Sequence, residues 1–271
     1  MKEPGNKTIQ DFGDQWSKYK SNDGWYGSSQ LFKDITSPLL EPADLEGKSV
    51  VDIGSGTGRI VSMLLEAGAA SVFAVEPATG AFETLVNNVK HMQRASDVTC
   101  INTQGASWTL TEQVDYVLSI GVIHHIPEPE PVIARAFVEL KPGGHIFLWV
   151  YGYEGNELYL RVFQPLRKIT ISLPHLLLRG VVELIYGLLF LYRYIGKVIP
   201  VPLYKYISKV LWPMTPAKRR LVIYDQLNPA YAKYYKKDEI EALLKNAGFE
   251  NVQAHHRHGY SWSVIGRKPI T

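Results

Sequence analysis

The sequence predicts an α/β protein built around a largely parallel sheet. Short apolar runs alternate with longer amphipathic runs over residues 49–151, and the same alternation returns after residue 237, as parallel strands with helical crossovers require. Hydrophobic residues make up 46% of the 271 residues and charged residues 20%, which is the profile of a packed globular protein. The length suits a core domain that carries a sizeable insertion.

The alternating region predicts five strands and three helices. The strands are expected at Ser49–Ile53, Ser71–Val75, Val98–Asn102, Val114–Ile120 and His145–Val150. The helices are expected at Arg59–Ala67, Thr79–Met92 and Pro131–Leu140. Gly68 supplies a left-handed end for the first helix, and Lys141–Gly144 is expected to be the turn between the third helix and the fifth strand.

The alternation is interrupted between residues 155 and 232. This segment carries many Leu, Tyr, Arg and Pro residues but no clean strand, and Leu176–Tyr194 is expected to be helical. We therefore expect a mostly helical cap inserted after the fifth strand. A helix at Lys237–Ala247 and strands at Val252–Arg257 and Ser261–Arg267, turning at Gly259, bring the sheet to seven strands.

A glycine-rich turn follows the first strand and leads straight into a helix. It reads Asp52-Ile53-Gly54-Ser55-Gly56-Thr57-Gly58-Arg59. Glycines let a ligand approach the backbone closely, and the amides at the helix start favour an electronegative group. A dinucleotide fingerprint would place its third glycine where this chain has Arg59, whereas the third glycine here is Gly58. A purely structural turn is the other alternative.

Two further segments accompany the turn. Glu76 ends the second strand, where a carboxylate can accept hydrogen bonds from both hydroxyls of a ribose, or can simply face solvent. Residues 115–127 (DYVLSIGVIHHIP) and 140–144 (LKPGG) follow in order. Together these motifs resemble those of class I S-adenosylmethionine-dependent methyltransferases, strongly over residues 45–151 and at the level of topology over 237–268. The resemblance implies a Rossmann-like sheet of order 3-2-1-4-5-7-6 with an antiparallel seventh strand.

The resemblance also implies S-adenosylmethionine as the cofactor and a set of residues around it. The expected cofactor residues are Asp52, Gly54, Ser55, Gly56, Thr57, Gly58, Glu76, Pro77, Gly105, Ala106, Ser107, Ile120 and Gly121. Many relatives carry an acid after the third strand, where this chain has residues 104–108 (QGASW), so backbone groups of Ala106 or the Ser107 side chain are expected there, with Trp108 or Leu110 against the adenine ring. Trp16 and Tyr19, on one face of a leading helix, either close over the cofactor or pack in the core.

Methyl transfer to a hydroxyl or an ammonium also needs a general base. His124, after the fourth strand, is expected to fill this role because the carboxyl edge of such sheets binds ligands and imidazole accepts protons near neutral pH. The alternative is that His124 and His125 only shape the loop. Residues expected to contact the acceptor are His125, Tyr151, Asp225, Asn228, Tyr231 and His256. The His255–His258 group lacks obvious further ligands, so no metal is expected.

These features divide the chain into an N-terminal helical lid (1–46), a cofactor-binding core (47–154), a cap that binds the acceptor (155–232) and a C-terminal part of the core (233–271). Net charge is +3 and the isoelectric point about 8.7, too weakly basic to indicate nucleic acid. One cysteine, Cys100, and a polar N-terminus without a signal-peptide pattern favour the cytoplasm.

The expected activity is transfer of a methyl group to O or N of a small-molecule acceptor of metabolite, sugar or natural-product type. Two alternatives remain. In one, residues 173–199 lie in a membrane interface and the acceptor is lipid-linked or quinone-type. In the other, the chain binds the cofactor as a non-catalytic partner subunit. The oligomeric state is left open.

Overall fold

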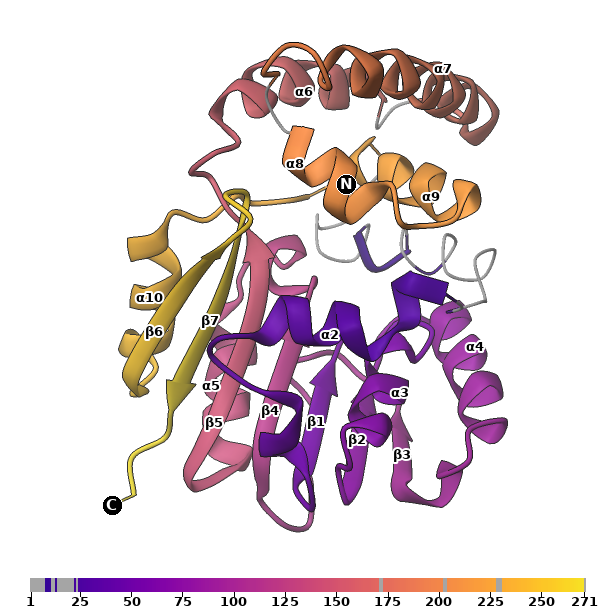
Figure 1. The fold of residues 1–271 in the computed structure, drawn as a ribbon. Coiled ribbons are helices and arrows are strands. Elements are labelled where there is room, and N and C mark those ends of the chain that lie inside the picture. Colours follow the sequence, from indigo (N-terminus) through magenta and orange to yellow (C-terminus); the bar gives the residue numbers. More distant parts are fainter. Residues whose placement is uncertain are drawn as a thin grey trace.

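The computed structural model describes residues 8–10, 13, 22, 24–170, 173–201, 204–227 and 231–270. Its centre is a seven-stranded sheet of order β3-β2-β1-β4-β5-β7-β6 (Figure 1). The strands are β1 (Ser49–Ile53), β2 (Ser71–Val75), β3 (Val98–Ile101), β4 (Val114–Ile120), β5 (Leu140–Tyr151), β6 (Glu250–Arg257) and β7 (Ser261–Arg267). The first five pair in parallel, and β7 runs antiparallel between β5 and β6. The predicted fold class and strand order are confirmed.

Helices cover both faces of the sheet. They are α2 (Ser29–Thr36), α3 (Arg59–Glu66), α4 (Thr79–Lys90), α5 (Glu130–Glu139) and α10 (Lys237–Asn246). One hydrophobic cluster joins α2, α3 and α4 to the sheet, and a second joins α5 and α10 to it. α2, expected within an N-terminal lid, contributes the buried Phe32 to the first cluster. Short 3₁₀ turns lie at Gly24–Gly27, Pro42–Leu45, Ala95–Asp97 and Ile123–His125.

The strand boundaries agree with expectation to within two residues except at β5. The expected turn at Lys141–Gly144 is part of this strand, because Leu140 already pairs with Val114 before the register shifts. Asp115 lies where the register shifts. Its carboxylate accepts a hydrogen bond from the Ser49 amide at 2.9 Å and forms an ion pair with the Lys141 ammonium at 2.9 Å. These contacts keep the segment beside β4, so the glycines form a bulge inside the strand rather than a loop before it.

The insertion after β5 is a helical cap over the carboxyl ends of the parallel strands (Figure 1). It contains α6 (Glu157–Thr170), α7 (His175–Ile195), α8 (Tyr204–Tyr206), a π-helical turn (Ile207–Leu211) and α9 (Pro216–Leu227). Its own small core joins Leu178 and Tyr186 of α7 to Tyr224 and Leu227 of α9. No helix in the described ranges is both long and apolar enough to cross a membrane.

Candidate functional site

A cavity of about 770 Å³ lies between the strand ends and the cap, within the size range of small-molecule sites. One half is lined by loops that follow β1, β2, β3 and β4, and the other by the cap, α2 and the β5–β7 region. We call these the cofactor half and the acceptor half. The cavity therefore lies where open α/β sheets bind their ligands.

The glycine-rich turn lines the cofactor half through Gly54, Ser55, Gly56 and Thr57. The backbone of Gly54 has φ +77°, and a Cβ built on it would lie 2.4 Å from Cγ2 of Val122. No side chain fits there unless the turn or Val122, two residues after β4, is displaced. The turn is held to β2 because the amides of Gly54 and Ser55 donate to the Val75 carbonyl at 2.8 and 3.1 Å.

Glu76 stands behind this turn, buried at the end of β2. One carboxylate oxygen accepts from the Gly56 amide at 2.8 Å, and the other accepts from the Ala78 amide at 2.9 Å. Burial raises the pKa of this carboxyl, against the two amide bonds. Each oxygen carries two lone pairs, so both can also accept hydrogen bonds from ligand hydroxyls in the cavity that Glu76 lines.

Asp52, just before the turn, is a buried acid with an unusual environment. Its Oδ2 has no hydrogen-bond partner among the described residues. Burial raises its pKa to about 7, against the Ser55 hydrogen bond and the charge of Arg59. A buried carboxylate oxygen without a partner is costly, which is why burial favours the protonated form of this group. Asp52 itself does not line the cavity, and neither does Gly58, which caps α3.

The segment after β3 contributes Gln104, Gly105 and Ala106 to the cofactor half. Trp108 does not reach a ligand there: it is buried in the core, and its Nε1 donates to the Gly105 carbonyl at 2.8 Å. This bond fixes the turn from behind. Ser107 and Leu110 also lie outside the lining, whereas the expected Pro77, Ile120 and Gly121 belong to it.

The acceptor half is rich in tyrosine, and one glutamine connects three of these side chains. The hydroxyls of Tyr159 and Tyr234 donate to Oε1 of Gln226 at 2.8 and 3.1 Å, and Nε2 of Gln226 donates to the Tyr151 hydroxyl at 3.0 Å. Gln226 and the three tyrosines all line the cavity, as does the expected Asp225. The lining residues that the sequence did not single out include Tyr26, Trp149, Asn156, Tyr206, Gln226, Arg257 and Tyr260.

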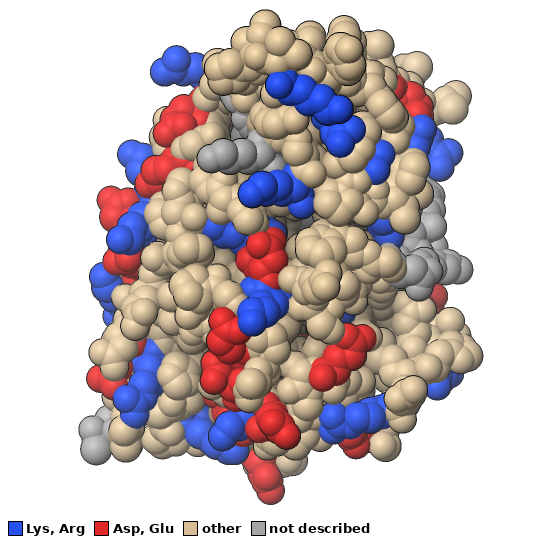
Figure 2. All heavy atoms as spheres, in the orientation of Figure 1, with Lys and Arg blue, Asp and Glu red and all other residues tan. Residues whose placement is uncertain are grey.

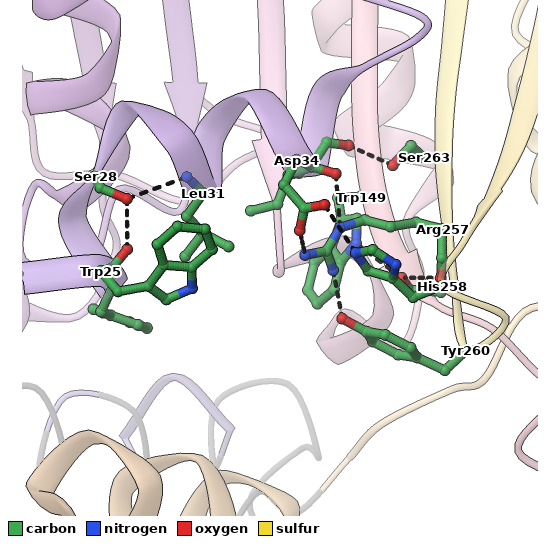
Figure 3. A network of polar contacts seen from close by, with 12 residues as sticks. Trp25, Ser28, Leu31, Asp34, Trp149, Arg257, His258, Tyr260 and Ser263 are labelled. Atoms are coloured by element: carbon green, nitrogen blue, oxygen red, sulfur yellow. Dashed lines mark hydrogen bonds and ion pairs between the residues drawn. The ribbon is translucent and has the colours of Figure 1, made fainter. Parts of the chain in front are cut away.

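The floor of the acceptor half is tied together by a buried arginine (Figure 3). Arg257 of β6 pairs with the carboxylate of Asp34 on α2, and its Nε donates to the Asp34 carbonyl at 2.8 Å. The same guanidinium donates to the Tyr260 hydroxyl and lies 6.0 Å from the Trp149 ring centre. His258 also contacts Asp34, at 2.8 Å. The network joins α2 to the β6–β7 hairpin and orients two aromatic lining residues.

The two adjacent histidines differ in their access to the cavity. His125 lines it, and its Nδ1 lies 2.9 Å from the Tyr231 carbonyl, so Nδ1 carries the proton and Nε2 the lone pair. His124 is fully buried beneath Tyr151, with ring centres 3.8 Å apart, and is not part of the lining. Neither ring nitrogen of His124 has a partner among the described residues. Burial lowers the pKa of both imidazoles, that of His125 to about 4.

The other expected acceptor residues are spread out. The Tyr231 side chain is not among the lining residues, and His256 stacks on Trp262 with ring centres 4.3 Å apart. Within the described ranges no group of three His, Cys, Asp or Glu residues could hold a metal. Trp16, Tyr19 and Asn228 lie outside the described residues.

Residues 26–254 match the model of a family described as a methyltransferase domain. The chain is 28% identical over 137 residues to a ubiquinone biosynthesis O-methyltransferase of Neisseria meningitidis serogroup C, covering 46% of this chain and 56% of that protein. It is 29% identical over 120 residues to a tRNA U34 carboxymethyltransferase of Pseudoalteromonas translucida, covering 44% and 36%. The matched segments thus span about half or less of these relatives.

Solved structures share the fold at low sequence identity. The magnesium protoporphyrin IX methyltransferase of Synechocystis, with bound S-adenosylhomocysteine, has a TM-score of 0.54 and 16% identity, covering 94% of this chain and 93% of that one. The S-adenosylmethionine-dependent methyltransferase SibL has a TM-score of 0.55 and 15% identity, covering 89% and 55%.

Proposed function

This chain belongs to the class I S-adenosylmethionine-dependent methyltransferases, and from that premise we propose that it methylates an oxygen or nitrogen atom of a small-molecule acceptor. The observation that carries the proposal is that one continuous cavity runs from the glycine-rich turn into a half lined by tyrosines and roofed by the cap. The aromatic lining favours a planar or amphipathic acceptor.

The residues of the cofactor half fit S-adenosylmethionine, which supplies a methyl group already activated on a sulfonium. Glu76 would accept from the ribose hydroxyls, and the buried Asp52 would support the glycine-rich turn from behind. Gln104, Gly105 and Ala106 would border the adenine. The remaining contribution of the protein is to align the acceptor atom and to exclude water, which supplies much of the rate in such transfers.

We assign proton removal to His125 rather than to His124. The assignment rests on access, because His125 lines the cavity whereas the ring of His124 lies beneath Tyr151. The Tyr231 carbonyl fixes the tautomer of His125 that leaves Nε2 able to accept a proton. The low pKa of His125 keeps this imidazole neutral near pH 7. Asp225 and the Gln226 cluster would then position the acceptor.

The proposal can be tested without knowing the acceptor. Purified protein and methyl-labelled S-adenosylmethionine are added to a cell extract, which is then separated into small molecules, lipids, RNA and protein. We expect the label in molecules of low mass, with or without a lipid tail, and a strong reduction with His125→Ala. His124→Ala serves as the matched control and should retain most of the labelling. Label found in RNA or protein would contradict the proposal, and an unchanged His125→Ala rate would contradict the assigned base.

A further inference from the structure

Helix α7 exposes an apolar side that nothing in the described structure covers. Among the described residues, ten of the fifteen large hydrophobic side chains that stand exposed lie between residues 176 and 199. Five of them, Leu177, Leu184, Leu188, Leu191 and Ile195, fall within an arc of about 60° on a helix of 3.6 residues per turn. We call these five residues the outer face of α7. Leu184, in the middle of this face, is 65% exposed, so the outer face is open to solvent in the described structure and is not packed into a core.

The opposite side of the same helix is apolar as well. Leu178, Val182 and Tyr186 pack against Ile223 and Leu227 in the cap core. A helix that is hydrophobic all round is normally covered all round, and an exposed apolar patch of this kind marks an interaction site. Within the described residues, α7 therefore has a packing partner on one side and none on the other.

The charge of the cap indicates what this partner is. Residues 155–232 carry eleven Lys and Arg against three Asp and Glu, whereas the rest of the chain carries eighteen against twenty-three. On the face shown in Figure 2, tan and blue atoms dominate the cap end, while most red atoms lie lower, over the sheet. Exposed Arg179 lies in the N-terminal part of α7, on another side of the helix from the outer face, and exposed Lys197 follows the C-terminal end of α7. Glu183 is neutralised by Arg220 at 2.6 Å.

We propose that the outer face of α7 docks on an anionic lipid bilayer. An aliphatic face on a helix whose exposed cations lie on another side and at its end, within a cationic segment of the chain, is the pattern of a helix that lies in the membrane interface. Two copies of the chain meeting through this face would bring two strongly cationic caps together, which like-charge repulsion disfavours. RNA would be bound through cations and aromatic faces, and would leave the row of aliphatic residues without a role.

The position of α7 relative to the cavity extends the proposal to the acceptor, and this step rests on the proposed function. α9 lies between α7 and the cavity, with Tyr224 packed toward α7 and Val222, Asp225 and Gln226 lining the acceptor half. Docking through α7 would hold the acceptor half on the membrane side of the molecule, with α7 and α9 between it and the lipid. The acceptor would then be an amphiphile that resides in the membrane, with its polar ring or head group in the tyrosine-lined half.

The test is co-sedimentation of the full chain with vesicles of phosphatidylcholine alone or mixed with phosphatidylglycerol. We expect the parent protein to pellet with the mixed vesicles. The variant Leu184→Gln/Leu188→Gln/Leu191→Gln should bind these vesicles at least roughly tenfold more weakly. Arg179→Glu and Lys197→Glu should each weaken the binding roughly fivefold. Val138→Gln/Ile270→Gln, exposed on the core, and Lys48→Glu/Lys90→Glu are the matched controls and should pellet like the parent. Thermal unfolding confirms that each variant is folded.

Several results would overturn the proposal. They are no pelleting with either vesicle, equal pelleting of the triple Leu→Gln variant, a dimer in light scattering that this variant abolishes, or RNA binding that depends on Arg179 and Lys197 alone. Titration of the same preparations with S-adenosylmethionine separates the two proposals. Cofactor binding without vesicle binding would refute the docking surface and leave the proposed methyl transfer standing.

Discussion

Replacing Gly54 by Ala should damage both stability and cofactor binding, by amounts that the structure lets us separate. An L-residue at φ +77° costs about 1–2 kcal/mol. The added Cβ would also lie 2.4 and 2.7 Å from the two γ-carbons of Val122, and overpacking of this kind costs about 1–3 kcal/mol. The two effects together predict that the free energy of unfolding falls by about 2–5 kcal/mol.

Gly47→Ala is the matched control. Gly47 has φ +70°, but a Cβ there would meet no atom within 4 Å, so only the backbone cost of about 1–2 kcal/mol remains. Urea unfolding measures both variants, and calorimetry measures their affinity for S-adenosylmethionine. We expect Gly54→Ala to be less stable than Gly47→Ala. It should also bind the cofactor at least roughly tenfold more weakly, because Gly54 or Val122, which both line the cavity, must shift. Equal destabilisation, or normal cofactor binding by Gly54→Ala, would refute the reasoning.

Two further predictions concern buried polar groups. Burial raises the pKa of Asp52 from 3.8 to about 7, so the folded state holds this proton more tightly than the unfolded state does. The free energy of unfolding should therefore fall by up to about 4 kcal/mol between pH 4 and pH 7, whereas Asp52→Asn should lose that part of the slope; identical pH profiles from urea unfolding would contradict this. Gln226→Leu should remove the three hydrogen bonds that Gln226 makes to Tyr151, Tyr159 and Tyr234. The free energy of unfolding should fall by roughly 2 kcal/mol or more, and the rate of methyl transfer should fall with normal cofactor affinity. Gln226→Glu keeps the acceptor oxygen and should lose less; equal losses in the two variants would count against the hydrogen-bond cluster.

The core of the fold and most of the cofactor half could be predicted because their signals are local. Alternating apolar runs indicate the strands, and the glycine spacing together with Glu76 indicates the cofactor-binding turn. In the structure the turn and Glu76 line the same cavity. The bulge at Lys141–Gly144 could not be read in this way. It depends on Asp115, which binds across to Ser49 and Lys141 only after the sheet has formed.

The acceptor half was predicted less completely, for two physical reasons. Its floor depends on Arg257 and Asp34, which are 223 residues apart and carry no shared pattern in the sequence. The choice between His124 and His125 depends on how a short 3₁₀ turn orients two neighbouring rings, and periodicity cannot resolve this. The tyrosines of the cap were visible in the sequence, but Gln226, which joins three of them, gave no signal of its own.

Calorimetric titration with S-adenosylmethionine and S-adenosylhomocysteine, with NAD as a control, tests the central claim most directly. We expect both sulfur compounds to bind and NAD not to bind. Glu76→Ala should weaken their binding by roughly a hundredfold because two charge-assisted hydrogen bonds to the ribose are lost. Binding of NAD without either sulfur compound, or unchanged affinity in Glu76→Ala, would contradict the account of the cofactor half.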